Sequence, residues 1–370
     1  MKLRQRIRSI LSRLGPTVRW RPDCRLDTSL IVTVDVEADS DKNWGTPDVR
    51  TFRNVLEAVP NRLHPLFAQY GVRPTYLVSP EVLQHNDCRA VLRNLSRCEL
   101  GAHLHVEDVP PESIAVGPTR PRRGMQWECA PEIERQKLQN LTQLFCNAFG
   151  KAPRSFRAGR FGIGHHTGKF LMELGYVVDS SVTPHVRWSW QEGAPIPDFT
   201  QAEELPYWVA DDGDIFKNGG FGLLEVPVTI LSAREGPSSR GSKPIWFRPW
   251  HTSRDLLRQV VRALACAPPS RREPIWFRPW YTSGDLLQQV VRALACASPS
   301  QGVRRPLVMM FHSVEVMAGA SPYPQTEAEV EKYLSVLGAV FDTVADCGIK
   351  SCTLSEYREK FLSVRNPGSS

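Results

Sequence analysis

The sequence of 370 residues predicts one α/β domain whose parallel strands close into a barrel. Two observations lead to this prediction. Segments rich in β-branched and aromatic residues alternate with segments whose apolar residues recur at helical spacing, as in a chain of β–α units. Seven or eight strand candidates can be recognised in this alternation, and that number favours a closed barrel over an open sheet.

The expected elements run from residue 29 to residue 360. The strand candidates are SLIVTVD (29–35), RPTYLVS (73–79), CELGAHLH (98–105), SFRAG (155–159), YVVDSSV (176–182), GLLEVPV (222–228), PLVMMFH (306–312) and, as the candidate for closing the sheet, KSCTL (350–354). Helical periodicity is strongest in three segments, 51–70, 132–149 and 326–346. We therefore expect a single domain over 29–360, preceded by a leader (1–28) and followed by a short tail (361–370).

The leader is basic. Residues 1–22 carry seven positive charges and no acid, and the whole chain has a net charge of +7, so the remainder sums to zero. We therefore expect no nucleic-acid partner. Residues 1–15 have apolar residues at helical spacing, which predicts peripheral contact with an anionic membrane surface, and a solvated leader is the alternative. The leader lacks the apolar core of a secretory signal, and the nine cysteines include no CxxC, so we expect a cytoplasmic protein, on the inner face of the membrane if the leader binds there.

A tandem duplication lies at 243–302. Residues 243–272 recur as 273–302 with seven differences, and two copies are too few for a solenoid. Each copy predicts an extended segment followed by an amphipathic helix, for which a barrel has one slot. The second copy leads directly into the strand at 306–312, so we expect it to fill the slot, with the first copy packed outside. The reverse assignment is the alternative.

Polar side chains gather where the predicted strands end. Asp35, Glu37 and Asp39 alternate at the end of the first strand and share one side if the chain stays extended. His103 and His105 likewise share one face of a strand, at a spacing that a divalent metal can use. Barrels keep their active sites at this end of the strands, although acids and histidines also occur wherever a strand reaches solvent.

Two further strand ends add basic groups. Arg157 and Arg160 lie in SFRAGRFGIG, where an arginine can orient a carboxylate through its two-pronged guanidinium or can simply face solvent. His312 ends an apolar strand and can act as a general acid near neutral pH. Together, these strand ends supply carboxylates, imidazoles and a guanidinium, which is a more specific pattern than any one of them.

Five segments in this order resemble the motifs of polysaccharide deacetylases with a NodB homology domain. They are TVDVEAD (33–39), ELGAHLH (99–105), SFRAGRFG (155–162), DSSVTP (179–184) and LVMMFHS (307–313). The resemblance covers about residues 29–356. It implies a distorted (β/α)7 barrel and a divalent metal, often zinc, that serves to remove acetyl groups from N- or O-acetylated sugars.

The resemblance also implies roles, position by position. Asp35 would be the base that deprotonates the attacking water, and Arg157 would hold Asp35 in place. His103 would bind the metal, and His312 would be the acid that protonates the leaving group. The backbone N–H near Phe161 would help to hold the oxyanion.

Two positions depart from the family pattern. The metal-binding second aspartate of the first motif is replaced by Val36, so we expect Glu37 to bind the metal, with Asp39 as runner-up. The second motif usually has its second histidine four residues after the first, where this chain has Glu107. We therefore expect His105 to supply the second imidazole, with Glu107 as the alternative ligand.

The sequence thus predicts a metal-dependent hydrolase, acting on non-peptide C–N bonds or acetyl esters of a cell-surface polysaccharide or its precursor. Zinc is the ion that the resemblance implies, and one carboxylate with two imidazoles would leave an open position on it. Carbohydrate is the expected partner, with Phe161 and Arg160 beside it. One alternative is a non-catalytic glycan-binding protein, and the other, less favoured, is a non-haem iron enzyme. The aromatic residues that could line a glycan groove are Trp44, Trp188, Trp190 and Trp280.

Overall fold

The computed structural model describes residues 28–45, 47, 49–112, 124–188, 197–234, 272–276, 285, 287–288, 291–292 and 306–365. The leader over 1–27 lies outside these ranges, as do most of the duplication, Trp190 and Trp280. Membrane contact through residues 1–15 therefore stays a prediction. Among the described helices, none combines the length and the apolar character that a bilayer crossing requires.

Parallel strands form the centre of the molecule. They are β1 (Ser29–Val36), β2 (Thr75–Val78), β3 (Glu99–Leu104), β4 (Ser155–Ala158), β5 (Val178–Asp179), β7 (Leu224–Glu225) and β10 (Leu307–His312). These strands pair in the order β10-β1-β2-β3-β4-β5-β7, and every pair is parallel. Each lies within one of the segments predicted as strands, except that β1 extends one residue beyond its segment, to Val36.

The barrel closes through the chain that follows β7. The N–H of Thr229 donates to the carbonyl of Val308 in β10 at 3.1 Å, and the Thr229 hydroxyl accepts from the Val308 N–H at 2.8 Å. The predicted closing strand at 350–354 was wrong in this respect. It forms only β11 (Lys350–Ser351), which pairs with the start of β1 outside the ring. The predicted fold class, a distorted (β/α)7 barrel, is confirmed.

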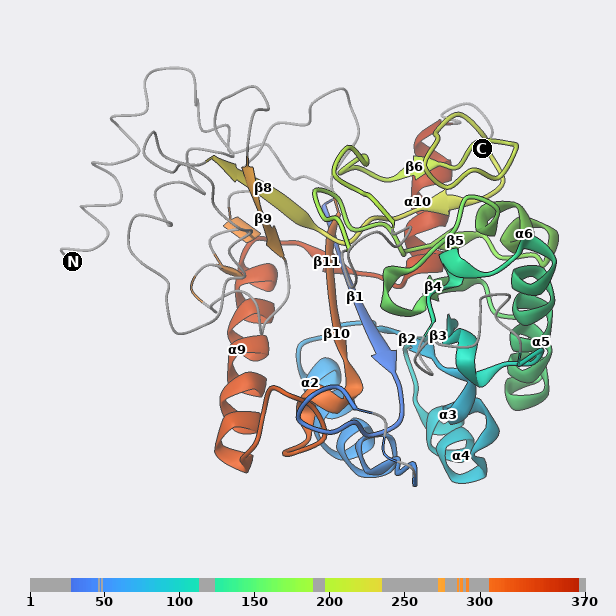
Figure 1. The fold of residues 1–370 in the computed structure, drawn as a ribbon. Coiled ribbons are helices and arrows are strands. Elements are labelled where there is room, and N and C mark those ends of the chain that lie inside the picture. Colours follow the sequence, from blue (N-terminus) through green and yellow to red (C-terminus); the bar gives the residue numbers. More distant parts are fainter. Residues whose placement is uncertain are drawn as a thin grey trace, which may run out of the picture.

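Helices surround the strands (Figure 1). They are η1 (Asn54–Leu63), α2 (His64–Gln69), α3 (Pro80–Gln84), α4 (Asn86–Asn94), α5 (Pro131–Phe149), α6 (Thr167–Glu173), α9 (Glu327–Asp346) and α10 (Leu354–Arg365), with short turns η2 (Val106–Asp108), η3 (Gln126–Glu128), η4 (Gly159–Phe161) and η6 (Ser313–Val316). Local signals explain the ends of the long helices. Pro131 begins α5 and Gly150 ends it in the left-handed conformation, with φ of 70°, while Thr326 caps α9.

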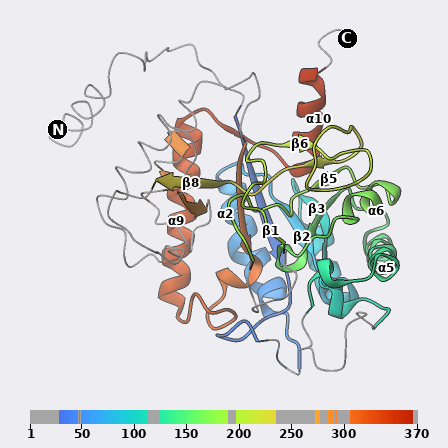
Figure 2. The ribbon, with the colours of Figure 1, turned by 45° about the horizontal axis from the view of Figure 1, so that its top comes forward.

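The interior of the barrel is apolar at one end and polar at the other. Along β1, Ile31, Thr33 and Asp35 point inward, while the alternate residues pack against the helices. The Ile31 end is filled by a cluster that includes Leu354 and Tyr357 of α10, so this helix covers the amino-terminal end of the strands (Figure 2). Helix α10 continues to Arg365, into the segment predicted as a tail. The carboxyl-terminal end is left to polar side chains.

Two short pairings were not predicted. Strand β6 (Tyr207–Trp208) runs antiparallel to β7, and β8 (Ile230–Arg234) pairs with β9 (Arg272–Trp276) as an antiparallel ribbon beside the barrel. Strand β9 includes the start of the second duplicate. Further along that copy, Leu287 and Val291 are fully buried in the same core cluster as the barrel strands.

The two copies provide a matched pair for a stability test. We expect Leu287→Ala to lower the free energy of unfolding by about 2–5 kcal/mol, because it empties a fully buried site. The equivalent Leu257→Ala in the first copy should cost less than half as much if the second copy fills the slot. Urea unfolding of both variants measures this. A larger loss for Leu257→Ala would reverse the assignment of the copies.

Candidate active site

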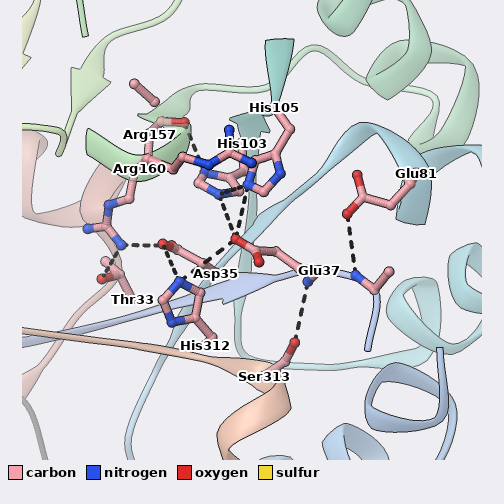
Figure 3. A network of polar contacts seen from close by, with 12 residues as sticks. Thr33, Asp35, Glu37, Glu81, His103, His105, Arg157, Arg160, His312 and Ser313 are labelled. Atoms are coloured by element: carbon pink, nitrogen blue, oxygen red, sulfur yellow. Dashed lines mark hydrogen bonds and ion pairs between the residues drawn. The ribbon is translucent and has the colours of Figure 1, made fainter. Parts of the chain in front are cut away.

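Strand alternation brings four of the predicted residues to the polar end of the barrel. Asp35 of β1 lies opposite His312 of β10, and His103 of β3 lies opposite Arg157 of β4, each as a direct neighbour across paired strands. Glu37 and His105 come one residue beyond the ends of β1 and β3. Figure 3 shows these side chains converging on one point.

Glu37, His103 and His105 place one ligand atom each at the corners of a triangle. The Oε1 atom of Glu37 is 3.0 Å from His103 Nε2 and 3.1 Å from His105 Nε2, and the two nitrogens are 3.1 Å apart. In a tetrahedral zinc site with bonds of about 2.0–2.1 Å, neighbouring ligand atoms are about 3.3 Å apart. The triangle therefore has nearly the size that such an ion requires.

The hydrogen-bond chemistry of this triangle also calls for a cation. His103 Nδ1 lies 3.1 Å from the carbonyl oxygen of Arg157, which can only accept, so Nδ1 carries the proton. In the neutral ring, Nε2 then turns its lone pair toward the Glu37 carboxylate, and two acceptors 3.0 Å apart repel each other. A positive charge between them removes the repulsion.

The pKa values of His105 and Glu37 also favour a positive charge within the triangle. Burial lowers the pKa of His105, but the Glu37 carboxylate outweighs it and raises that pKa to about 9. Burial raises the pKa of Glu37, yet the neighbouring imidazoles hold it well below its ordinary value. Glu37 thus favours a positive charge at His105. The donor set of one carboxylate and two imidazoles fits a divalent ion such as zinc.

Asp35 is held by an arginine that is completely buried. The Arg157 Nη1 group donates to Asp35 Oδ1 at 2.8 Å and to Thr33 Oγ1 at 3.0 Å. Its other nitrogens donate to the backbone carbonyl and hydroxyl of Ser180, within the DSSVTP segment. Burial raises the pKa of Asp35, but Arg157 together with His103 and His312 outweighs burial, and the net shift is downward. Asp35 is therefore an ionised carboxylate near the triangle.

His312 faces both carboxylates of the site. Its Nε2 atom lies 4.0 Å from Asp35 Oδ2 and 3.8 Å from Glu37 Oε1. Its Nδ1 atom lies 3.1 Å from Oε1 of Glu315, a buried carboxylate that also accepts from the Tyr333 hydroxyl. Glu315 thus fixes the ring so that Nε2 points into the site. Glu315 was not among the predicted site residues, although its place three residues after His312 matches the capping-box spacing.

The two runner-up ligands make other contacts. Asp39 accepts hydrogen bonds from the Thr51 hydroxyl, the Arg53 N–H and the Asn54 side chain, and so anchors the start of η1. Glu107 forms a two-pronged ion pair with Arg160, with contacts of 2.5 and 3.2 Å. Both carboxylates are engaged away from the triangle, Asp39 by neutral donors and Glu107 by Arg160, which leaves Glu37 and His105 as the ligands we favour.

The loop after β4 is unusual in its backbone. Arg160 and Phe161 both have φ of 54°, in the left-handed region that bulky residues rarely adopt. The Phe161 ring stacks on Trp188 at 5.4 Å, and the Arg157 guanidinium lies 5.7 Å from its centroid. The role of the Phe161 N–H in holding an oxyanion stays a prediction.

The buried carboxyl of Glu134 holds the residues that follow this loop. Glu134 of α5 accepts from the Gln126 amide at 2.7 Å and from the Thr167 hydroxyl, which itself accepts from the Gly164 N–H. Burial raises the pKa of Glu134 from 4.5 to about 7. The folded protein thus favours the protonated form, so its stabilising contribution is complete below pH 4.5 and is lost as the pH rises through 7.

We expect Glu134→Gln to remove this pH dependence. Relative to the variant, the wild type should lose about 1–3 kcal/mol of unfolding free energy between pH 5 and pH 8. Denaturant unfolding at both pH values measures the difference. Glu132→Gln, at an exposed position of the same helix, is the control and should behave like the wild type. An unchanged pH dependence in Glu134→Gln would show that this carboxyl is ionised in the folded protein.

Comparison with known proteins found similar solved structures at low sequence identity. The chain matches no family model and no curated protein. It is similar to a suspected polysaccharide deacetylase from Mycobacterium smegmatis, at 16% identity over 95% of both chains with a TM-score of 0.48. It is also similar to a probable polysaccharide deacetylase from Pseudomonas aeruginosa PAO1, at 13% identity over 96% of both chains with a TM-score of 0.49. A third similar structure is a family 4 acetyl xylan esterase from Clostridium thermocellum in complex with a cobalt ion, at 13% identity over 89% of both chains with a TM-score of 0.37.

Proposed function

We propose that the protein is a metal-dependent hydrolase that removes acetyl groups from a carbohydrate. The observation that carries this proposal is the triangle of Glu37, His103 and His105 beside a separate ionised carboxylate, Asp35. One carboxylate is thereby available to bind a cation while the other is available to take up a proton. Zinc is the ion we propose, and its geometry suits the three donors.

A bound divalent ion would supply Lewis acidity, which lowers the pKa of water and polarises the acetyl carbonyl. Asp35 would take the proton from the attacking water at Oδ2, since Arg157 occupies Oδ1. His312 would then donate a proton from Nε2 to the leaving nitrogen or oxygen. Water thus adds to the carbonyl carbon, the C–N or C–O bond breaks, and the products are acetate and a free amine or alcohol.

The distance between Asp35 and His312 allows the first to act as base and the second as acid on the same substrate. Oδ2 of Asp35 and Nε2 of His312 are 4.0 Å apart, close enough for both to reach one acetyl carbon and its substituents. Arg157 keeps Asp35 ionised, and Glu315 keeps His312 turned toward the site. Each group is therefore held in the orientation that its step requires.

The carbohydrate part of the proposal is supported by aromatic side chains beside His312. The half-buried Trp44 ring lies 5.0 Å from the His312 ring and 5.5 Å from the Tyr323 ring, measured between centroids. Trp44 adopts φ of 60°, and its loop is fixed where Ser40 bonds to the Ala320 carbonyl. An indole held in this way at the acid offers a surface for the apolar face of a sugar ring.

We expect Trp44→Ala to lower kcat/KM for an acetylated oligosaccharide by about tenfold, the loss of one aromatic stacking contact. Hydrolysis of p-nitrophenyl acetate, which has no sugar ring, should change by less than about twofold. Trp44→Phe keeps a stacking surface and should retain most of the activity on the oligosaccharide. Equal losses on both substrates would mean that Trp44 supports the catalytic groups and not the sugar.

A further inference from the structure

Glu81 is a buried carboxylate that the proposed reaction does not use. It is 7% exposed and lies at the start of α3, directly after β2. Strand β2 pairs with β1 and β3, so Glu81 comes from the element between Glu37 and His105. Its Oε1 atom accepts from the Ala38 N–H at 3.3 Å, while Oε2 is buried without a hydrogen-bond partner in the described part of the chain. A buried carboxylate oxygen in this state calls for a donor.

Two candidate donors are close to Glu81: the buried Ser79 hydroxyl and the ring of His105. We argue for His105, because its carboxylate partner would act on the candidate metal site. Figure 3 shows Glu81 on the side of His105 that faces away from His103. The Nε2 atom of His105 is directed at Glu37 and His103, so Nδ1 is the nitrogen that remains for Glu81. Glu81, His105 and Asp108 each have a ligand atom within 4.8 Å of the others. Asp108 is ion-paired with Arg50, and Glu81 is therefore the carboxylate of this group that is left for His105.

We propose that Glu81 is the positioning residue that makes His105 a metal ligand. By accepting a hydrogen bond from Nδ1–H, it would fix the tautomer in which the Nε2 lone pair points at the centre. The Arg157 carbonyl already does this for His103, at 3.1 Å from Nδ1. Carboxylates that hold the far nitrogen of a ligand histidine typically contribute about 10–100-fold to metal affinity. This inference rests on the proposed function, because it presumes that the triangle holds a metal.

Zinc affinity of the full-length protein tests the proposal, measured by competition with a chromogenic chelator. We expect Glu81→Gln to weaken binding by about 10–100-fold. The glutamine can satisfy either the Ala38 N–H or the His105 N–H with its single oxygen, but not both. Asp108→Asn should change the affinity by less than about threefold, and Glu57→Gln, at an exposed position of η1, should match the wild type.

Several results would overturn the assignment. A Glu81→Gln affinity within twofold of the wild type removes the positioning role but leaves the proposed function standing. Loss of binding in Asp108→Asn with retention in Glu37→Gln places the ion among Glu81, His105 and Asp108 instead. A wild type that binds no zinc contradicts the proposed function itself.

A second measurement does not depend on how the variants fold. Nitrogen-15 NMR of the zinc-loaded wild type reports which nitrogen of each histidine carries a proton. The proposal expects His105 with a proton on Nδ1 and zinc on Nε2. The opposite tautomer would overturn it.

Discussion

Replacing Glu37 with glutamine is expected to weaken zinc binding by more than about a hundredfold and to abolish acetate release. Glu37 contributes the single carboxylate of the triangle, and its Oε1 atom lies within 3.1 Å of both histidine nitrogens. The amide keeps the size of the side chain but loses the charge that balances the ion. Zinc titration of the variant, with an acetate assay at saturating zinc, measures both losses.

Asp39→Asn is the matched control, because it is the other acid at this strand end. It should retain zinc and activity, and lose about 1 kcal/mol of unfolding free energy because Asp39 anchors the start of η1. If Asp39→Asn loses the metal while Glu37→Gln keeps it, our choice of ligand is wrong.

Asp35→Asn is expected to lower kcat by about 10²–10⁴-fold while zinc affinity changes only a few-fold. The asparagine oxygen can still accept from Arg157, but the amide cannot take a proton from water. The variant should also be less stable, since the buried Arg157 loses the carboxylate that it pairs with, at a cost of about 3–5 kcal/mol. Pre-steady-state acetate release well below the unfolding temperature separates slow chemistry from unfolding.

The comparison between Glu37→Gln and Asp35→Asn is the important one. The first variant should fail to bind zinc, and the second should bind zinc and fail to turn over. A kcat for Asp35→Asn within tenfold of the wild type would mean that another group takes the proton.

Residues on regular strands could be placed from the sequence. Asp35, His103 and Arg157 lie on strands whose inward and outward positions alternate, so apolar neighbours on the outward face fix their direction. Since the barrel is parallel, all the carboxyl-terminal strand ends meet at one end. These two rules suffice to bring the side chains together without any knowledge of the loops.

Residues beyond the strand ends could not be placed in this way. Strand β1 ends at Val36, so Asp39 is no longer on the strand and turns toward η1. After His105 the chain enters the short turn η2, which carries Glu107 off the strand face and toward Arg160. Alternation stops where the extended backbone stops, and local hydrogen bonds then decide the direction of the side chain.

Glu81 and Glu315 were missed for a related reason. Both are acids that follow a strand by three residues, at the start of a helical turn, and both are buried. In a sequence, such acids are typical of exposed helix starts. Their burial can be recognised only in the folded barrel, where the neighbouring strands surround them. There Glu81 lies near His105, which follows another strand, and Glu315 bonds to His312 at the end of its own strand.

The central claim is that a metal held by Glu37, His103 and His105 is needed to release acetate. Acetate release from a panel of acetylated oligosaccharides, with and without chelator, tests it most directly when wild type and His103→Ala are compared. We expect release by the wild type, its loss on chelation and recovery with zinc, and no release by His103→Ala. Release that persists in the chelated wild type, or in His103→Ala, would contradict the claim.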